Sequence, residues 1–411
     1  MINDALVLRF TRAVALVTMA FYTAGHAAVG FPLFLIGAVG RVLTLHPPLW
    51  RRTPLDLPFV AFGVALVLAT VASAYRSIAV PSMLLTLIST AVLFGSFAWL
   101  VGRDPGARAL LLRVWALGAP PAAVIGVIAG GMVHDRAFFP RMPMGTNAFG
   151  TTLFLGSVMA LGFAYRAERR ARPLWFACAL VSLVGLLATQ SRSALGGWVA
   201  GAVYLTWREL RAHPRQLAVA LASGIAVLAL AATAAPSVAA RVGHVSTDLV
   251  VDRVQIWRIA VGIVESHPLL GTGPGTFQTM FNQRKPAGFE RKWSAHNLWL
   301  HYAVETGLVG LFSILWIVYV AGREWARSGH LPLAGQDPFR PTITAASIGL
   351  LVDSCGDNTL LSVSTVSGAW LLLALLVVAP AWPVRPDHRV LVAPQEEAVL
   401  VAGTRLREGS P

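Results

Sequence analysis

The stretch that decides the fold is residues 147–165, NAFGTTLFLGSVMALGFAY, which contains no charged side chain. A second run of this kind, LWFACALVSLVGLLATQ at residues 174–190, follows after a short basic segment. A helix needs about 20 predominantly apolar residues to cross the hydrocarbon core of a bilayer. Because both runs meet that requirement, they predict two consecutive membrane-spanning helices.

Runs of this type recur over the whole chain of 411 residues, which is 56% hydrophobic and only 13% charged, with a mean hydropathy of +0.65. Ordinary soluble domains are about 25% charged, so the composition excludes disorder and argues against a water-soluble enzyme. The pattern predicts an all-α polytopic membrane protein that forms a single integral domain over residues 1–411. The expected spans, about twelve, lie near residues 5–23, 27–44, 55–74, 79–101, 109–132, 147–165, 174–190, 193–207, 216–235, 297–321, 341–358 and 363–383.

Basic residues fall in every second short loop, which sets the orientation of the spans. These loops hold Arg51/Arg52, Arg103/Arg108, Arg166/Arg169/Arg170/Arg172, Arg208/Arg211/Arg215 and Arg323/Arg327. Arginine and lysine mark cytoplasmic loops, so both termini are expected in the cytoplasm, with residues 384–411 as a cytoplasmic tail. The formal charge of +14 is thereby accounted for without nucleic acid as a partner. The only cysteines, Cys178 and Cys355, lie in apolar runs, which leaves no disulfide framework and no cysteine metal motif.

Residues 236–296 are too long for a simple connection and fall on the outer, periplasmic side of this topology. Residues 252–266, DRVQIWRIAVGIVES, have apolar side chains at helical spacing. The turn-rich segment LLGTGPGTF follows at residues 269–277. We therefore expect a large loop with short helices that forms a cap over the bundle, and loops of this length usually carry function.

Several arginines on the same outer side favour an anion site, most naturally for the phosphates of a lipid carrier, although a solvated surface or contact with anionic headgroups explains the loop charges as well. Arg192 is the sharpest case, because the sequence Thr189–Ala194 (TQSRSA) leaves almost no loop between two spans. An ionisable residue at that depth is a functional-site candidate by default, with snorkelling to the interface as the alternative. Arg141 and Asn147 lie at the entry of the sixth span on the same side. Arg141 could pair with a phosphate, and Asn147 either caps that helix or binds substrate.

Two histidines stand at the entry of the tenth predicted span, His296 and His301. Their spacing differs from the i, i+4 pair of a zinc site, so a metal pair is disfavoured. A histidine beside basic residues suits general base catalysis, because its pKa lies near working pH. Asp353 and Asp357 form the nearest carboxylate pair, which could hold a cation or a proton or form a polar turn paired with arginine. Without a convincing carboxylate cluster, a Mg²⁺- or Mn²⁺-dependent transferase is disfavoured.

Taken in order, these motifs resemble a known family. His296-Asn297, nine residues, then Gly307-Leu308-Val309-Gly310 is similar to the H-[NSQ]-x9-G-x-x-G signature of the O-antigen ligase and polymerase superfamily. Arg253-x-x-x-Trp257 followed by the segment HPLLGTG at residues 267–273 resembles the family's periplasmic-loop pattern. The Ser191-Arg192-Ser193 turn and the asparagine Asn147 at the start of a span match further family features.

The resemblance implies a glycosyltransferase of the bacterial inner membrane that moves a glycan from undecaprenyl diphosphate at the periplasmic face, with no metal and no cofactor. In the ligase branch the acceptor is the lipid A–core oligosaccharide, and in the polymerase branch it is another lipid-linked repeat unit. A third branch, which glycosylates protein, carries an additional C-terminal region that this chain lacks. Chain length and the compact loop favour the ligase, with the polymerase as the alternative.

The residues and the resemblance together predict an inverting transfer. His296 is the expected general base. Arg192 and Arg253 are the first choices for binding the diphosphate, and Arg141 and Arg258 are second choices. His301 either orients the acceptor or anchors the helix. A transporter is the rival class, because twelve spans with Arg192, Asp353 and Asp357 would suit a substrate pathway, but no internal repeat is evident.

Overall fold

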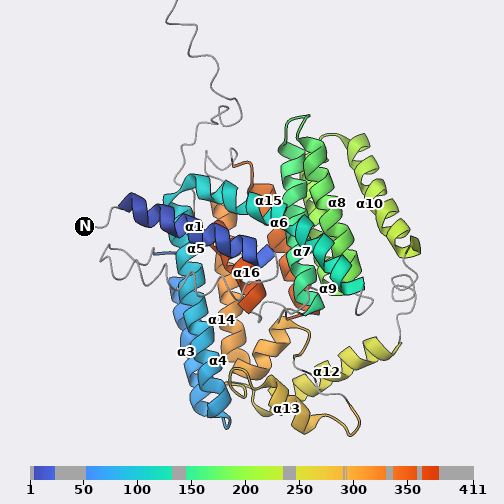
Figure 1. Cartoon of the computed structure of the whole chain (residues 1–411). Helices are drawn as coiled ribbons and strands as arrows, with labels where there is room; N and C mark the ends of the chain where they lie inside the picture. Colours follow the sequence, from blue (N-terminus) through green and yellow to red (C-terminus); the bar gives the residue numbers. More distant parts are fainter. Residues whose placement is uncertain are drawn as a thin grey trace, which may run out of the picture. The chain divides into compact units, whose positions relative to one another are not determined.

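The computed structural model describes residues 4–23, 52–131, 145–234, 247–289, 292, 294–329, 337–358 and 363–378. All of them lie in one compact unit, Met1–Pro380. Within these ranges the regular elements are helices alone (Figure 1). The predicted all-α class is confirmed. The expected span at 27–44 and the tail at 384–411 lie outside the described residues.

Each predicted span that falls on described residues contains a helix with similar bounds. These helices are α1 (Asp4–Thr23), α3 (Asp56–Ala72), α4 (Arg76–Ser89), α5 (Gly95–Arg103), α6 (Pro105–Gly131), α7 (Thr146–Arg166), α8 (Arg172–Thr189), α9 (Arg192–Leu210), α10 (Pro214–Ala234), α14 (Leu298–Ser328), α15 (Arg340–Gly356) and α16 (Val363–Val377). A π-helical turn, Thr90–Phe94, makes α4 and α5 one continuous stretch.

Five helical stretches of the described chain are long and apolar enough to cross a membrane. They are Arg76–Arg103, Gly106–Ile128, Thr146–Arg166, Arg172–Thr189 and Leu298–Ser328. The chain is therefore a multi-pass membrane protein. The number of twelve spans stays a prediction.

Helix α7, the stretch that opened the sequence analysis, is the most buried of these five. It packs against α6, α8, α9 and α15 (Figure 1). Small residues make this packing close, because a side chain on Gly150 would overlap Ser191 and one on Gly162 would overlap Thr342. Apolar side chains gain little from association inside a bilayer, so close van der Waals contact between small residues is what holds such helices together.

Helices α9 and α15 approach each other backbone to backbone. A Cβ on Gly197 would lie 2.6 Å from the carbonyl oxygen of Gly349, and a Cβ on Gly349 would lie 2.6 Å from that of Gly197. One turn along, a Cβ on Gly201 would lie 2.7 Å from the carbonyl oxygen of Ala345. This backbone contact fixes the start of α9 beside the end of α15, which is where the polar site forms.

The long predicted loop contains two helices, α12 (Thr247–Ser266) and α13 (Phe277–Arg284). The expected helix at 252–266 is confirmed and begins earlier, at Thr247. Helix α13 was not expected, because the glycines at 271–275 obscured the helical pattern that follows them. The two helices share a small core with the start of α14, formed by Ile256, Ala260, Ile263, Phe277, Met280, Phe281, Ala295 and Val304.

Helix α14 is broken at Gly307, where the backbone takes φ 64° and ψ −167°. The segment 268–273 fills the break: the amides of Leu308 and Val309 donate to the carbonyls of Pro268 (2.8 Å) and Leu269 (3.2 Å). In the other direction, the Gly273 amide donates to the carbonyl of Glu305 at 2.8 Å. The break would otherwise leave backbone groups without partners. The H-P-L-L-G-T-G segment and the G-x-x-G segment are therefore two halves of one interlock.

Candidate functional site

The site forms where three helices begin and one ends. Helices α7, α9 and α14 start at Thr146, Arg192 and Leu298, and α15 ends at Gly356. Within the described part of the chain, neither α7 nor α9 has a side-chain cap. Uncapped helix starts direct backbone N–H groups and the positive end of the helix dipole toward the same place, which favours an anion.

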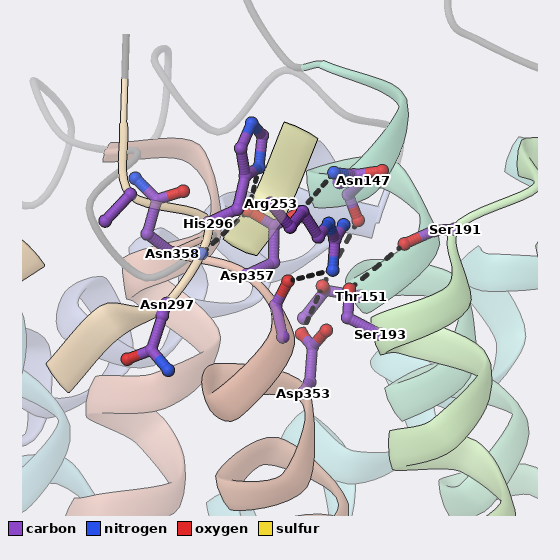
Figure 2. A network of polar contacts seen from close by, with 12 residues as sticks. Asn147, Thr151, Ser191, Ser193, Arg253, His296, Asn297, Asp353, Asp357 and Asn358 are labelled. Atoms are coloured by element: carbon purple, nitrogen blue, oxygen red, sulfur yellow. Dashed lines mark hydrogen bonds and ion pairs between the residues drawn. The ribbon is translucent and has the colours of Figure 1, made fainter. Parts of the chain in front are cut away.

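Asp357, which follows α15, is the centre of the polar network (Figure 2). One carboxylate oxygen, Oδ2, accepts a hydrogen bond from the side-chain amide of Asn147. The other, Oδ1, accepts from the backbone amide of Asn358 at 2.7 Å and lies 3.4 Å from Nδ1 of His296. The Asp357 side chain is only 4% exposed. A carboxylate held by several donors is fixed in position and stabilised as an acceptor.

His296 is presented to this carboxylate by unusual backbone geometry. It has φ 49°, a left-handed conformation that side-chain-bearing residues rarely adopt. The next residue, Asn297, caps α14 by accepting from the Leu300 amide at 2.9 Å, and its amide donates to the carbonyl of Cys355 at 3.1 Å. Strained residues held by well-bonded neighbours are typical of active sites.

The His296 ring is 32% exposed, and its second nitrogen is directed away from Asp357 (Figure 2). With Nδ1–H donating to the carboxylate, Nε2 is the nitrogen that can accept a proton. A carboxylate in this position fixes the tautomer and stabilises the imidazolium that forms.

Arg253 joins the same cluster from helix α12. Its Nη1 donates to the carbonyl of Gly356 at 2.9 Å, at the C-terminal end of α15. The helix is held there by Trp257, whose indole N–H donates to the carbonyl of Ala295 at 2.9 Å. The Arg-x-x-x-Trp spacing thus brings a guanidinium to Gly356, the residue before Asp357, and ties its helix to the residue before His296.

Below this network, Thr151 on α7 donates to Oδ2 of Asp353 on α15 at 2.6 Å. Asp353 is fully buried. The i, i+4 pair Asp353/Asp357 therefore joins α15 to α7 at two levels. Among the described residues, no group of three or more His, Cys, Asp or Glu side chains is placed to hold a metal ion.

The structure brings together three of the predicted site residues, namely Asn147, Arg253 and His296. Arg192 begins α9, next to Ser193, which would be 2.9 Å from a Cβ on Gly356. Arg141 lies outside the described residues. Capping by Asn147 was one open alternative, but the residue preceding α7 is Gly145, and the Asn147 side chain reaches Asp357 instead.

Arg258 lies elsewhere on α12. It is exposed and lines a shallow groove with Val254, Val261 and Glu265. Five residues along a helix turn a side chain by about 140°, since each residue advances it by about 100°. Arg253 and Arg258 consequently serve different faces.

His301 lies one turn inside α14 and is buried. Its Nε2 lies 3.2 Å from Oε1 of Glu305, and both side chains are less than 10% exposed, at 7% and 8%. The same Glu305 oxygen accepts from the backbone amide of Phe277 at 3.1 Å, and the His301 ring stacks on the Phe277 ring with centroids 4.8 Å apart. The histidine thus anchors α14 to α13, one of the two roles considered for it.

Sequence reasoning missed two residues of these networks. Thr151 carries no recognisable signal, because threonine is common in membrane helices. Glu305 does carry one, since an acidic residue inside an apolar run is rare and usually functional. Asp357 was considered only as half of a carboxylate pair, not as the partner of His296.

A cavity of about 640 Å³ runs along α14 from the polar site toward the opposite end of the helix. It is lined by α3, α4, α14, α15, α16 and the segment 274–278. Near the site its lining includes Gln278, Trp299, His301, Glu305 and Asn358. Further along it is mostly apolar, with a few serine and threonine residues. The lining is therefore amphipathic along its length, which matches a lipid with a polar head.

The geometry supplies a base with an orienting carboxylate, a guanidinium beside them, two uncapped helix starts and an adjoining amphipathic cavity. A comparison with curated protein sequences found no match. A scan against protein families matched the O-antigen ligase family over residues 176–315. That range includes Arg192, Arg253, His296 and the interlock of 268–273 with Gly307, so the resemblance inferred from the motifs is confirmed there: residues 176–315 match the O-antigen ligase family.

Proposed function

We propose that the chain is an O-antigen ligase, which transfers O-antigen polysaccharide from undecaprenyl diphosphate to the lipid A–core oligosaccharide and so completes lipopolysaccharide. The observation that carries this proposal is the His296–Asp357 pair beside Arg253 and the start of α9. It is a base next to an anion site, which is what transfer from a glycosyl diphosphate requires. The family match and the multi-pass architecture support the same conclusion.

In the proposed reaction, the acceptor hydroxyl oxygen attacks the anomeric carbon of the donor glycan. The bond between that carbon and the diphosphate oxygen breaks, and undecaprenyl diphosphate leaves with the bonding electron pair. His296 Nε2 takes the hydroxyl proton, and Asp357 stabilises the imidazolium. General base catalysis of this kind contributes about 10²–10⁴-fold.

The leaving diphosphate needs charge neutralisation rather than protonation. Arg192 and Arg253 are proposed to bind it, together with the amides at the starts of α7 and α9. Preorganised donors aimed at developing charge stabilise the transition state without having to reorganise. With one carboxylate devoted to His296, a single displacement with inversion is favoured over a covalent glycosyl intermediate.

The predicted topology belongs to this proposal as well. Residues 236–296 would form a periplasmic cap inserted between the ninth and tenth spans of a single integral domain, with both termini in the cytoplasm and the site facing the periplasm of the inner membrane. Membrane lipids would surround the bundle. The exposed apolar side chains of α3, such as Val60, Val64 and Val71, fit that environment.

The decisive experiment is deletion of the gene followed by electrophoresis of surface lipopolysaccharide. Loss of all glycan-capped core is expected for a ligase. Core that bears a single repeat unit would identify a polymerase instead. Purified protein with donor and acceptor in the same micelle gives the complementary test: transfer there, retained in EDTA, excludes a transporter, which needs two compartments.

A further inference from the structure

We propose that the end of the cavity nearest the site is a subsite for an uncharged, hydroxyl-bearing sugar of the acceptor, with the Glu305 carboxyl group as its principal hydrogen-bond partner. This inference rests on the proposed function for the identity of the acceptor. It concerns residues that the catalytic network around Asp357 does not use.

The first observation is that, in the part of the chain that the structure describes, only one of the two carboxyl oxygens of Glu305 is hydrogen-bonded. One oxygen, Oε1, is held by the Phe277 amide and by His301. The other, Oε2, takes part in no hydrogen bond among the described residues, yet Glu305 lines the cavity. A carboxyl group with only one oxygen satisfied, in a largely apolar surrounding, requires a donor from a ligand or from water.

The second observation is the set of residues that line the cavity near Glu305. Trp299 and Tyr302 give the cavity aromatic surface there, while Gln278 and Asn358 give it amide groups. A ring packs against the C–H face of a sugar, and carboxyl and amide groups pair with its hydroxyls. A few polar groups placed on an apolar wall are what fix the orientation of a bound small molecule.

Charge separates this subsite from the one for the diphosphate. The described residues that line the cavity include no arginine and no lysine. The carboxyl group of Glu305 would oppose a phosphate in the cavity, whereas Arg253 lies across the network at Gly356. The donor diphosphate and the acceptor sugar would therefore approach His296 from different sides.

The cavity also extends to Asn358, the residue that follows Asp357. Asn358 lines it, and the Asn358 backbone amide is bonded to the Asp357 oxygen that faces His296. A sugar held at Glu305 can thus present a further hydroxyl toward His296. His301 acts through Glu305, since its Nε2 and the Phe277 stack fix the carboxyl group, and it is a positioning residue.

The test is equilibrium binding of core-only lipopolysaccharide to the full chain in nanodiscs, with Glu305→Gln compared with the wild type. Loss of a charge-assisted hydrogen bond should weaken this binding about tenfold. Binding of undecaprenyl diphosphate should stay unchanged. Glu324→Gln is the matched control, because Glu324 is the same residue type at the other end of α14 and pairs only with Arg323 and Arg327 among the described residues.

Equal binding of core-only lipopolysaccharide by wild type and Glu305→Gln would overturn the subsite, as would weakened binding of undecaprenyl diphosphate instead. If Glu305→Gln does not fold, Trp299→Leu takes its place, with a severalfold loss of acceptor binding expected and no loss contradicting the proposal. Turnover is measured separately. Wild-type protein that binds the acceptor but transfers no glycan would contradict the proposed function and leave the subsite standing.

Discussion

Two histidine–carboxylate pairs lie at the start of one helix, and they differ in almost every physical respect. The His296 ring is 32% exposed and its partner Asp357 comes from another helix. His301 is 7% exposed and its partner Glu305 is one turn further along the same helix. In the first pair, the ring is accessible, the His296 backbone is strained and Arg253 contacts the adjacent Gly356. In the second pair, the His301 ring is buried and stacked on Phe277, and Glu305 faces the cavity. An accessible histidine can exchange a proton with a substrate, whereas a buried and stacked histidine fixes the position of its carboxylate partner.

The largest effect should separate the two histidines. His296→Ala removes the proposed base and should lower kcat by about 10²–10⁴-fold. His301→Ala should act mainly on the KM for acceptor, because it loosens Glu305 without removing the base. Steady-state kinetics on purified protein measure both. Near-normal kcat in His296→Ala would remove His296 from the role of base.

Asp357→Asn tests whether the proposed base His296 depends on its carboxylate partner. An amide in this position can donate to Nδ1 and so favour the wrong tautomer, as well as losing the charge that stabilises imidazolium. We expect a fall in kcat of at least about tenfold, smaller than that of His296→Ala, with protein yield and thermal stability close to wild type. If Asp357→Asn behaved like wild type in kcat, His296 would not depend on this carboxylate.

The helix ranges could be predicted from sequence because the bilayer imposes one length and one composition on every span. The contacts between side chains of different helices could not be predicted in this way. Asn147 and Asp357 are 210 residues apart, and nothing in either segment identifies the other. The break at Gly307 was hidden for a related reason. The run around it is apolar and is typical of an uninterrupted helix. Only the hydrogen bonds that the Leu308 and Val309 amides donate to the carbonyls of Pro268 and Leu269 show why the helix can stop there.

The break at Gly307 leads to a third prediction, which concerns the interlock next to His301 and Glu305. Gly307→Ala places a side chain at φ 64° and against the carbonyl of Leu269. Such backbone strain costs of order 1–3 kcal/mol. The apparent melting temperature should fall by several degrees, and activity should fall with it because α13 and the start of α14 lose their common anchor. Gly224→Ala is the control, since a Cβ there meets nothing within 4 Å; equal melting of the two variants would show that the interlock is not needed.

The next prediction concerns Arg192 and Arg253, which are proposed to bind the leaving diphosphate. Arg253→Lys and Arg192→Lys keep the positive charge but lose the planar fork that suits phosphate. Loss of one hydrogen bond to a charged group corresponds to about 10–100-fold in kcat/KM. The decrease should appear for the donor and not in binding of core-only lipopolysaccharide. Wild-type kinetics in both variants would mean that a point charge suffices.

The smallest effect is expected at Arg258, and it tests whether position rather than charge defines the site. Arg258 shares α12 with Arg253 but lies in the shallow groove beside Glu265, and no described contact links it to Asp357 or His296. Exposed substitutions of this kind change stability or binding by about 0.5 kcal/mol at most, which is about twofold in a rate or equilibrium constant. Arg258→Ala should therefore keep kcat/KM within about twofold of wild type at fixed ionic strength. A tenfold loss would mean that the substrate covers both faces of α12, so that the anion site extends beyond the His296–Asp357 pair and Arg253.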